Sequence, residues 1–278
     1  MMKNALNKLV DTVSKVFTSK SGDKDLRIIH LDTVDSTNNY LMTYKPETDD
    51  KITVVIADEQ TAGRGQGMNH WESEPGKNLT FSILIHPTMV PLARQFLLSE
   101  MEALAMYDVL GDILGKEDVK MKWPNDIYWK DRKISGTLIE TKVGGSHVKD
   151  CIFGTGIDVN QQVFHSDAPN PVSMYQILGH DTDLKALLDK LLESFKKYYA
   201  ALENGEYAAI SELYHAGLYR AHGFYRYLDV KEQKEFEAAI VEVEDSGRLI
   251  LRDREGEISS YYFKEIAFLN DSSEEQKG

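Results

Sequence analysis

Cysteine is nearly absent from this chain of 278 residues, and the one present, Cys151, excludes an internal disulfide framework and a cysteine-rich zinc site. The eight histidines show no His-x-His or His-x-x-x-His pair, so we assign no zinc. No stretch approaches the roughly 18 consecutive apolar residues that a membrane-spanning helix requires. The N-terminal segment also lacks the uninterrupted apolar core of a signal peptide. We therefore expect a cytoplasmic protein that does not bind a membrane.

Basic residues are too few to balance the acidic ones. The chain has 32 Lys and Arg against 45 Asp and Glu, which gives a net charge of -13. Such a surface repels phosphate backbones, so we expect no binding to nucleic acid. Apolar residues make up 42% and charged residues 28%, as in ordinary globular proteins, and this excludes general disorder and a fibrous fold.

Hydrophobic spacing divides the chain into four parts. Apolar residues recur at helical spacing from Leu6 to Phe17, which predicts a short amphipathic helix, followed by a polar linker from Ser19 to Lys24. The expected parts are a helical extension at 1–25, a large domain at 26–220, a small β-module at 221–270 and a disordered tail at 271–278.

Two periodicities predict the elements of the large domain. Runs of β-branched and apolar residues predict strands at 26–31, 53–57, 79–85, 119–123, 127–129, 134–143 and 148–155. Apolar residues at every third or fourth position predict helices at 39–45, 92–114, after a cap at Asp181 and near 206–217, with a loop over 161–180. Residues 221–270 alternate apolar and polar side chains between turns, which predicts a small antiparallel barrel.

A polar loop follows the second strand and has glycine at every second position, Gly63, Gly65 and Gly67, with Arg64 between the first two. Backbone N–H groups next to glycine, together with a guanidinium, suit a phosphate or carboxylate ligand. The loop matches neither a Walker A motif nor Gly-x-Gly-x-x-Gly. A surface loop without a ligand has the same composition, so both interpretations stay open.

The run Lys122-Trp123-Pro124-Asn125-Asp126 ends the strand at 119–123, and Lys133 directly precedes the strand at 134–143. The two lysines suit the neutralisation of an α-phosphate, Asp126 suits Mg²⁺, and Asn125 suits a hydrogen bond to a substrate. A hairpin turn with solvated lysines explains the same residues.

A third polar motif, Asp35-Ser36-Thr37-Asn38, lies at a strand-to-helix junction. Small hydrogen-bonding side chains at this position cap helices, and helix N-termini also bind polar ligand groups. The motif alone does not separate these two roles.

The order and spacing of these motifs resemble the biotin protein ligase family over residues 28–270. Lys-Trp-Pro-Asn-Asp followed by Lys-x-x-Gly-x-Leu-x-Glu is highly specific to that family. The matching segments are Asp35–Asn38, Asp58–Gly65, Trp71, Gly76–Leu79, Lys122–Asp126, Lys133–Glu140 and Gly156–Asn160.

The resemblance implies an α+β fold: a mixed, largely antiparallel sheet with helices, of the class II synthetase-like biotin and lipoate ligase type, and a C-terminal SH3-like barrel. It implies that residues 26–220 form a catalytic domain that uses Mg²⁺ and ATP to convert biotin to biotinyl-5′-AMP. The biotinyl group would then pass to a lysine of the biotin carboxyl carrier domain of a carboxylase. A homodimer is compatible with the family.

We expect the monofunctional type, because only about 25 residues precede the first strand and a separate DNA-binding domain needs roughly 40.

The resemblance also implies roles for individual residues. Lys133, Arg64 and Lys122 would be catalytic, and Asp126 is the candidate ligand of Mg²⁺. Biotin would contact Ser36, Thr37, Asn38, Gln60, Arg64, Gly65, Gln66, Lys133 and Gly136. ATP would contact Arg64, Trp71, Lys122, Asn125, Lys133 and Asn160.

The glycine loop departs from the family pattern Gly-Arg-Gly-Arg-x-Gly-Arg, because Gln66 and Asn69 stand where the second and third arginines are expected. We expect this loop to hold the adenylate less by charge and more by amide hydrogen bonds. Two alternatives to a biotin ligase remain: a lipoate or octanoate ligase with the same core, and a biotin-binding sensor without turnover.

Overall fold

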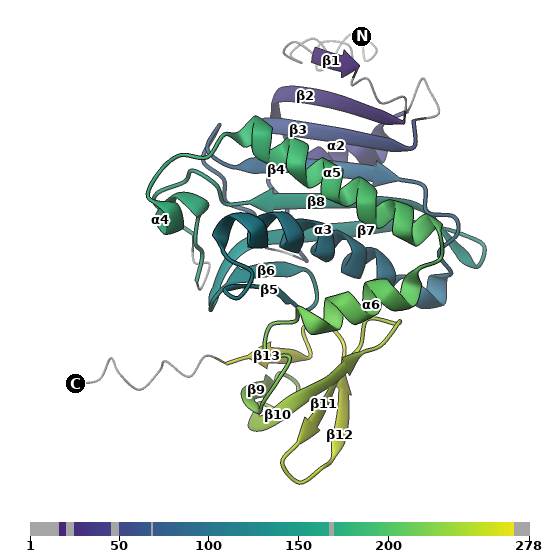
Figure 1. Cartoon of the computed structure of the whole chain (residues 1–278), viewed down its shortest axis with the longest axis vertical. Coiled ribbons are helices and arrows are strands. Elements are labelled where there is room, and N and C mark those ends of the chain that lie inside the picture. The colour runs from purple at the N-terminus through teal and green to yellow at the C-terminus, as the bar shows by residue number, and fades with distance from the viewer. Residues whose placement is uncertain (1–16, 21–24, 46–49, 68, 167–169, 270–278) are drawn as a thin grey trace, which may run out of the picture. The chain divides into compact units, whose positions relative to one another are not determined.

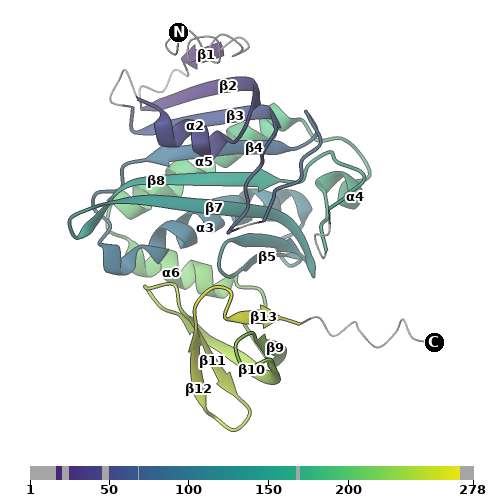
Figure 2. The same cartoon turned by 180° about the vertical axis from the view of Figure 1, so that it is seen from behind.

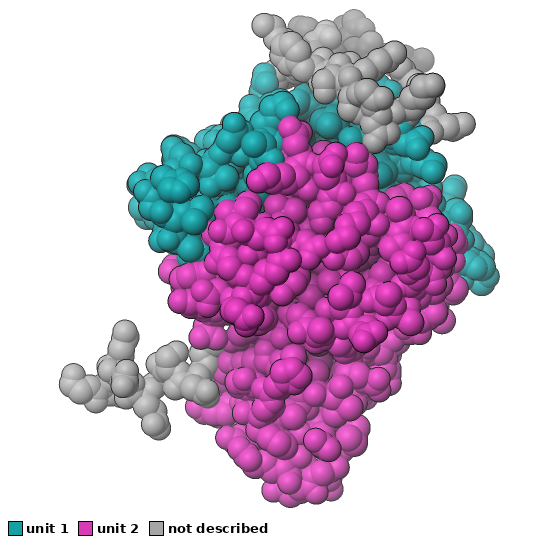
Figure 3. All heavy atoms as spheres, in the orientation of Figure 1, with its two compact units in different colours: residues 1–88, 134–188 teal, residues 89–133, 189–278 magenta. Residues whose placement is uncertain are grey.

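The computed structural model describes residues 17–20, 25–45, 50–67, 69–166 and 170–269. The chain divides into two compact units, shown in two colours in Figure 3. Unit 1 contains residues 1–88 and 134–188, and unit 2 contains residues 89–133 and 189–278. The domain boundary expected near residue 220 does not coincide with this division and stays a prediction.

Unit 1 is built on a mixed sheet with the strand order β1-β2-β3-β4-β8-β7 (Figure 1). Only β2 and β3 are parallel; the other neighbours pair in antiparallel fashion. All seven residues of β4 are buried, including the polar Thr80 and Ser82, whose hydroxyls are hydrogen-bonded. The strands are β1 (Phe17–Lys20), β2 (Leu26–Val34), β3 (Ile52–Gln60), β4 (Leu79–Ile85), β7 (Arg132–Gly144) and β8 (His147–Ile157).

Among its described residues, unit 1 contains two complete helices, α2 (Thr37–Thr43) and the short α4 (Met174–Leu178). α2 lies against one face of the sheet, as Figure 2 shows, and contacts β3, β4 and β8. Its Leu41 joins an apolar cluster with Ile29, Leu31, Val55, Leu84 and Ile152. The sheet therefore fixes the start of α2, where the polar motif lies.

Unit 2 combines helices with a second sheet. Helix α3 (Phe96–Leu114), preceded by one 3₁₀ turn (Leu92–Arg94), packs against α6 (Tyr207–Ala216) and the hairpin of β5 (Val119–Lys122) and β6 (Asp126–Trp129). Most of α5 (Leu184–Glu203) also belongs here. The second sheet is antiparallel, with the order β12-β11-β10-β9-β13. Its strands are β9 (Tyr225–Asp229), β10 (Lys234–Val243), β11 (Leu249–Asp253), β12 (Ile258–Tyr261) and β13 (Ile266–Phe268).

Polar contacts attach this C-terminal sheet to the rest of unit 2. Arg94 Nε donates to Asp245 Oδ2 at 2.7 Å, and Trp123 Nε1 donates to the Gly247 carbonyl at 3.0 Å. His215, on α6, accepts a hydrogen bond from Val243 N at its Nε2 atom at 2.8 Å. The small β-module is therefore held by specific bonds to the 3₁₀ turn before α3, to the residue that follows β5, and to α6.

The α+β class with a mixed sheet and a small C-terminal β-module is confirmed, and β4 has the bounds that the sequence predicted. The prediction of a loop over 161–180 is wrong at α4, which Ser173 and Gln176 begin with a capping box. The predicted cap at Asp181 is also wrong: α5 begins at Leu184, and Asp183 Oδ1 accepts from Ala186 N at 3.0 Å.

At the N-terminus, Phe17–Lys20 form strand β1 along β2, so Phe17 is not helical and Ser19 is not in a linker. The remainder of the expected helix, residues 1–16, lies outside the described residues, and so does the tail at 271–278.

Candidate functional site

Three buried polar residues, Ser36, Thr37 and Asn38, lie where β2 ends and α2 begins. Ser36 occupies the N-cap position, yet its side chain makes no capping hydrogen bond. Thr37 donates to Gln60 Oε1 from its backbone N at 2.9 Å and from its Oγ1 at 3.1 Å. Helix capping alone therefore does not account for this motif, because its side chains bond to the neighbouring strand.

Ser82, on the buried strand β4, continues this hydrogen-bonded set. Its Oγ lies 2.7 Å from Thr37 Oγ1 and 2.5 Å from Asn38 Oδ1. Asn38 Nδ2 donates in the other direction, to the Leu138 carbonyl at 3.3 Å and to Glu140 Oε2 at 2.8 Å. We call Thr37, Asn38, Gln60 and Ser82 the polar floor.

Gly154 on β8 leaves the space that Asn38 fills. A Cβ atom at this position would lie 2.1 Å from Asn38 Oδ1, closer than any real Cβ contact. Only glycine therefore allows the polar floor to pack in this arrangement.

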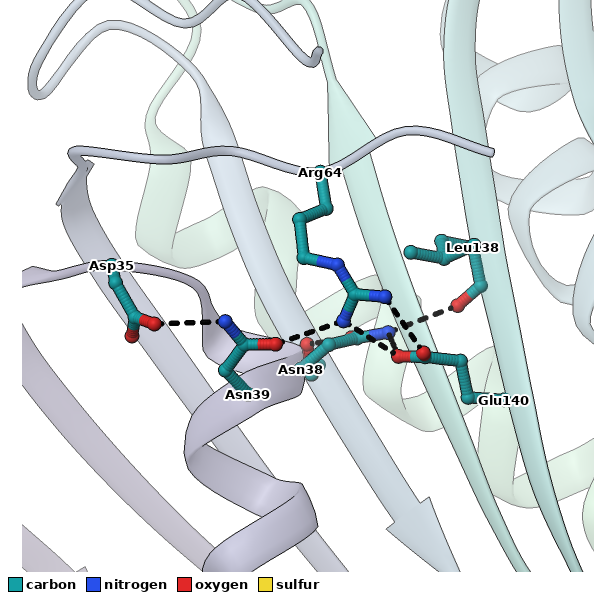
Figure 4. A network of polar contacts seen from close by, with 7 residues as sticks. Asp35, Asn38, Asn39, Arg64, Leu138 and Glu140 are labelled. Carbon is teal, nitrogen blue, oxygen red and sulfur yellow. Dashed lines mark hydrogen bonds and ion pairs between the residues drawn. The ribbon is translucent and has the colours of Figure 1, made fainter. Parts of the chain in front are cut away.

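Arg64, in the glycine loop, extends toward Asn39 and Glu140, as Figure 4 shows. Its guanidinium donates to Glu140 through both Nη atoms, at 2.9 and 3.2 Å, and to Asn39 Oδ1 at 2.8 Å. Within the loop, Gly65 N donates to the Asn69 carbonyl at 2.8 Å. Glu140 therefore connects the loop to Asn38 and so to the floor.

Trp71 follows the glycine loop, and its indole ring lies against Gly156 of β8. A Cβ on Gly156 would come within 2.2 Å of the indole ring, so the ring touches the backbone there. Gly136 on β7 is the register partner of Gly156. This part of unit 1 therefore presents an aromatic face beside two strands that carry no side chain at the paired positions.

In unit 2, Lys122 ends β5 with its ammonium among aromatic rings. Its Nζ donates to Tyr128 Oη at 2.8 Å and lies 4.3 Å from the centre of the Tyr128 ring and 5.1 Å from that of Phe268. Burial lowers the pKa of Lys122 to about 8; nearby Lys133 and Arg220 lower it too, whereas Asp126 opposes them. At neutral pH the group is still a cation, and a bound anion would stabilise its charge.

Lys133 pairs with Asp126 in the same unit, with Nζ and Oδ1 2.7 Å apart. Both side chains are largely shielded, with 33% and 20% of their surface exposed. The hairpin of β5 and β6 thus places Asp126 beside one lysine, and Asp126 influences the pKa of the other.

Three further residues predicted for the site lie outside both the polar floor and the pair of lysines. The Asn160 side chain bonds to the backbone N and carbonyl of Thr182 at 2.8 and 2.9 Å, so it fixes a loop in unit 1. Asn125 is half-buried in the turn between β5 and β6. Gln66 Oε1 is a buried acceptor without a hydrogen-bond partner among the described residues.

The predicted site residues therefore fall into two sets, one in each unit. Unit 1 holds Ser36, Thr37, Asn38, Gln60, Arg64, Gly65, Gln66, Trp71, Gly136 and Asn160, and unit 2 holds Lys122, Asn125, Asp126 and Lys133. The residues to which the sequence analysis gives no role in the site are Asn39, Ser82, Glu140, Gly154 and Tyr128. The matched motif did include Glu140, but not its contact with Arg64, which is 76 positions away.

Among the described residues, no group of three or more His, Cys, Asp or Glu side chains is placed to hold a metal ion. The same residues contain no helix long and apolar enough to cross a membrane.

Comparison with known proteins gives consistent matches. The model of the biotin/lipoate A/B protein ligase family matches residues 31–158. The biotin–[acetyl-CoA-carboxylase] ligase of Paracoccus denitrificans is 32% identical over 208 residues, which cover 73% of this chain and 85% of that protein. A bifunctional ligase/repressor of Bacillus subtilis is 33% identical over 152 residues, which cover 53% of this chain but 46% of that protein. The chain thus spans about half the length of the Bacillus ligase/repressors that it matches.

A solved structure extends the likeness to the fold. The biotin protein ligase from Aquifex aeolicus, solved in complex with biotin and ATP, is 25% identical, with a TM-score of 0.71. The match covers 89% of this chain and all of that one.

Proposed function

The chain belongs to the biotin protein ligase family, and from this premise we propose that it activates biotin with ATP and transfers the biotinyl group to a lysine of a biotin carboxyl carrier domain. The observation that supports this most is the polar floor beside Arg64. Uncharged donors and acceptors suit a ureido ring, and a guanidinium suits a carboxylate. Biotin carries both groups at opposite ends of one molecule.

In the first half-reaction, a biotin carboxylate oxygen attacks the α-phosphorus of ATP. A new P–O bond forms, the bond from that phosphorus to the bridging oxygen of the β-phosphate breaks, and pyrophosphate leaves. Two anions must approach each other, so cations are needed to remove their repulsion. We assign this role to Arg64, Lys122 and Lys133.

In the second half-reaction, the acceptor lysine attacks the acyl carbon of biotinyl-5′-AMP as a neutral amine. A C–N bond forms, the bond from the acyl carbon to the phosphate oxygen breaks, and AMP leaves with the electron pair while the amine loses a proton. No covalent enzyme intermediate is required. The acyl-adenylate must be shielded from water until the acceptor arrives, and we assign this to the glycine loop.

The remaining residues are assigned by position in the family pattern. Ser36, Thr37 and Asn38 would bind the ureido end, with Gln60, Gly65 and Gln66 along the biotin side. Trp71, Asn125 and Asn160 would border the nucleotide, and Gly136 would border both biotin and the nucleotide. The bonds that occupy Asn160 fit a role in shaping this border better than direct contact with the base.

Mg²⁺ would enter with the triphosphate, because Mg²⁺ is commonly held by one or two carboxylates and substrate phosphates. Asp126 is the carboxylate assigned to it, and its pairing with Lys133 means that the ion would compete with this lysine. The acceptor would be a carrier domain, and a homodimer remains part of the proposal.

Mass spectrometry of a purified carrier domain tests the complete reaction. The carrier is incubated with the protein, MgATP and one acid at a time: biotin, lipoate or octanoate. We expect a mass increase by one biotinyl group, on one lysine, with biotin alone. Modification by lipoate or octanoate would assign the chain to the sister activity, and biotin binding without modification would indicate a sensor.

A further inference from the structure

The guanidinium of Arg64 is held on two sides. Nη1 donates both of its protons, one to Asn39 Oδ1 at 2.8 Å and one to Glu140 Oε2 at 3.2 Å. Nη2 donates one proton to Glu140 Oε1 at 2.9 Å. Asn39 is itself fixed, because its Nδ2 donates to Asp35 Oδ2 at 2.8 Å (Figure 4).

One edge of the Arg64 guanidinium keeps N–H groups that are available for a ligand. A guanidinium has five N–H groups, and three of them are used by Asn39 and Glu140. The other two are Nε–H and the second Nη2 proton, which lie on one edge and point the same way. Neither has a hydrogen-bond partner among the described residues. Such an edge binds a carboxylate or phosphate with two parallel hydrogen bonds.

Glu140 is a rigid support for this edge. Its Oε2 also accepts from Asn38 Nδ2 at 2.8 Å, and Asn38 is oriented by Ser82 and confined by Gly154. The carboxylate is largely buried, with 22% of its side chain exposed. The orientation of Arg64 is therefore set by the sheet, although Arg64 itself lies in a loop.

We infer that Glu140, with Asn39, is a positioning residue that keeps the free edge of Arg64 ready for the carboxylate of the acid substrate. This rests on the proposed function and deepens it. Arg64 keeps its bonds to Glu140 when the ligand binds and uses the opposite edge for the ligand. The alternative is a latch in which Glu140 competes with the ligand for Arg64.

The variant Glu140→Asp separates the two. It keeps the charge but withdraws the carboxylate by one methylene, so the two-bond contact with Arg64 is lost. We measure by calorimetry the affinity for biotin and for biotinol, its uncharged alcohol. Positioning predicts about 10-fold weaker binding of biotin and a change of less than about 2-fold for biotinol, since bonds to charged groups are worth roughly tenfold or more in affinity.

Two further variants distinguish the loss of Arg64 positioning from a general folding defect. Asn39→Ala removes the other support of Arg64 without changing any charge, and we expect about 3-fold weaker binding of biotin with biotinol unchanged. Asp150→Glu is the matched control, because it moves by one methylene a carboxylate of unit 1 that pairs with His86 rather than with Arg64. Its affinities for both ligands should equal those of the unaltered protein.

Three outcomes overturn the inference. Tighter binding of biotin by Glu140→Asp would mean that Glu140 is a competing latch. Equal losses for biotin and biotinol would mean a purely structural role, and an unaltered protein without a preference for the acid would mean that Arg64 binds no carboxylate. Octanoate and octanol are titrated in parallel. If the protein binds this pair and not biotin and biotinol, biotin is refuted as the substrate. The change in affinity for the acid relative to the alcohol, caused by Glu140→Asp, then still tests the role of Glu140.

Discussion

Replacing Lys122 by methionine should stabilise the protein while it removes activity. The pKa of this lysine falls from 10.5 to about 8, chiefly through burial, so its ammonium is costly in the folded state. At about 1.4 kcal/mol per pKa unit the cost is on the order of 3 kcal/mol. Loss of the bond to Tyr128 offsets about 1 kcal/mol, which leaves a net gain of about 2 kcal/mol. Methionine has a similar length and is accepted well among aromatic rings.

The pH dependence of this gain follows from the direction of the pKa shift. Below pH 8 the lysine is charged in both the folded and the unfolded states, so the unaltered protein carries the full cost. Between about 8 and 10.5 the folded state releases the proton first, and its stability relative to the variant recovers as the pH rises. The advantage of Lys122→Met should therefore be full at pH 7 and vanish near pH 10.5.

Denaturant unfolding at pH 7 and pH 10, together with ATP–pyrophosphate exchange at pH 7, measures both effects. Lys120→Met, two residues earlier on β5, is the control for removing one positive charge from the same strand. For the unaltered protein, kcat/KM for ATP should fall above about pH 8, because the neutral amine no longer attracts phosphate. A destabilised Lys122→Met variant at pH 7, or one with normal exchange, would refute the assignment of a costly, functional ammonium.

Three other substitutions test single contacts. Lys133→Ala should lower the exchange rate by about 100-fold or more while the protein stays folded, because charge stabilisation at the reacting phosphate is lost. Gly154→Ala should abolish biotin binding, because the new Cβ would displace Asn38 from the polar floor. Gln66→Gly should release the adenylate several times faster, as measured by trapping free biotinyl-5′-AMP, because a side-chain amide of the glycine loop is lost.

For Lys133→Ala and Gly154→Ala, the folded state of the variant is checked first. Each of the three predictions also has a result that would contradict it. Gly144→Ala is the control for the glycine change, since its Cβ would approach Lys149 no closer than 3.2 Å. Normal exchange by Lys133→Ala would remove the central role of that lysine. Unchanged biotin affinity in Gly154→Ala would mean that Asn38 does not shape the site, and unchanged adenylate release after Gln66→Gly would mean that this side chain does not retain it.

Local patterns predicted those parts of the fold that depend on neighbours in sequence. The mainly apolar run of β4 ends before Pro87, which marks the end of the strand, and Gly144-Gly145 marks the turn between β7 and β8. The sequence does not determine the start of α5, because both Asp181 and Asp183 are good capping residues; in the structure Asp183 accepts from Ala186 N. The sequence does carry a local signal for the short helix α4, the Ser-x-x-Gln capping box at Ser173 and Gln176.

The site shows the same division between local and distant contacts. The motif at Thr37 was identified from its residue types, and its partner Gln60 was expected in the same group. The pairing of Arg64 with Glu140 could not be predicted, because it depends on a loop returning to a strand 76 residues later. Nor could the low pKa of Lys122, which arises from burial that no local pattern encodes.

ATP–pyrophosphate exchange by the purified protein tests the central claim most directly, because it reports the adenylation step without needing the acceptor. The reaction contains MgATP and labelled pyrophosphate with biotin, lipoate, octanoate or no acid. The proposed function predicts exchange that depends on biotin and is absent with the other acids. Exchange with lipoate or octanoate instead, or no exchange by a protein that binds biotin, would contradict it.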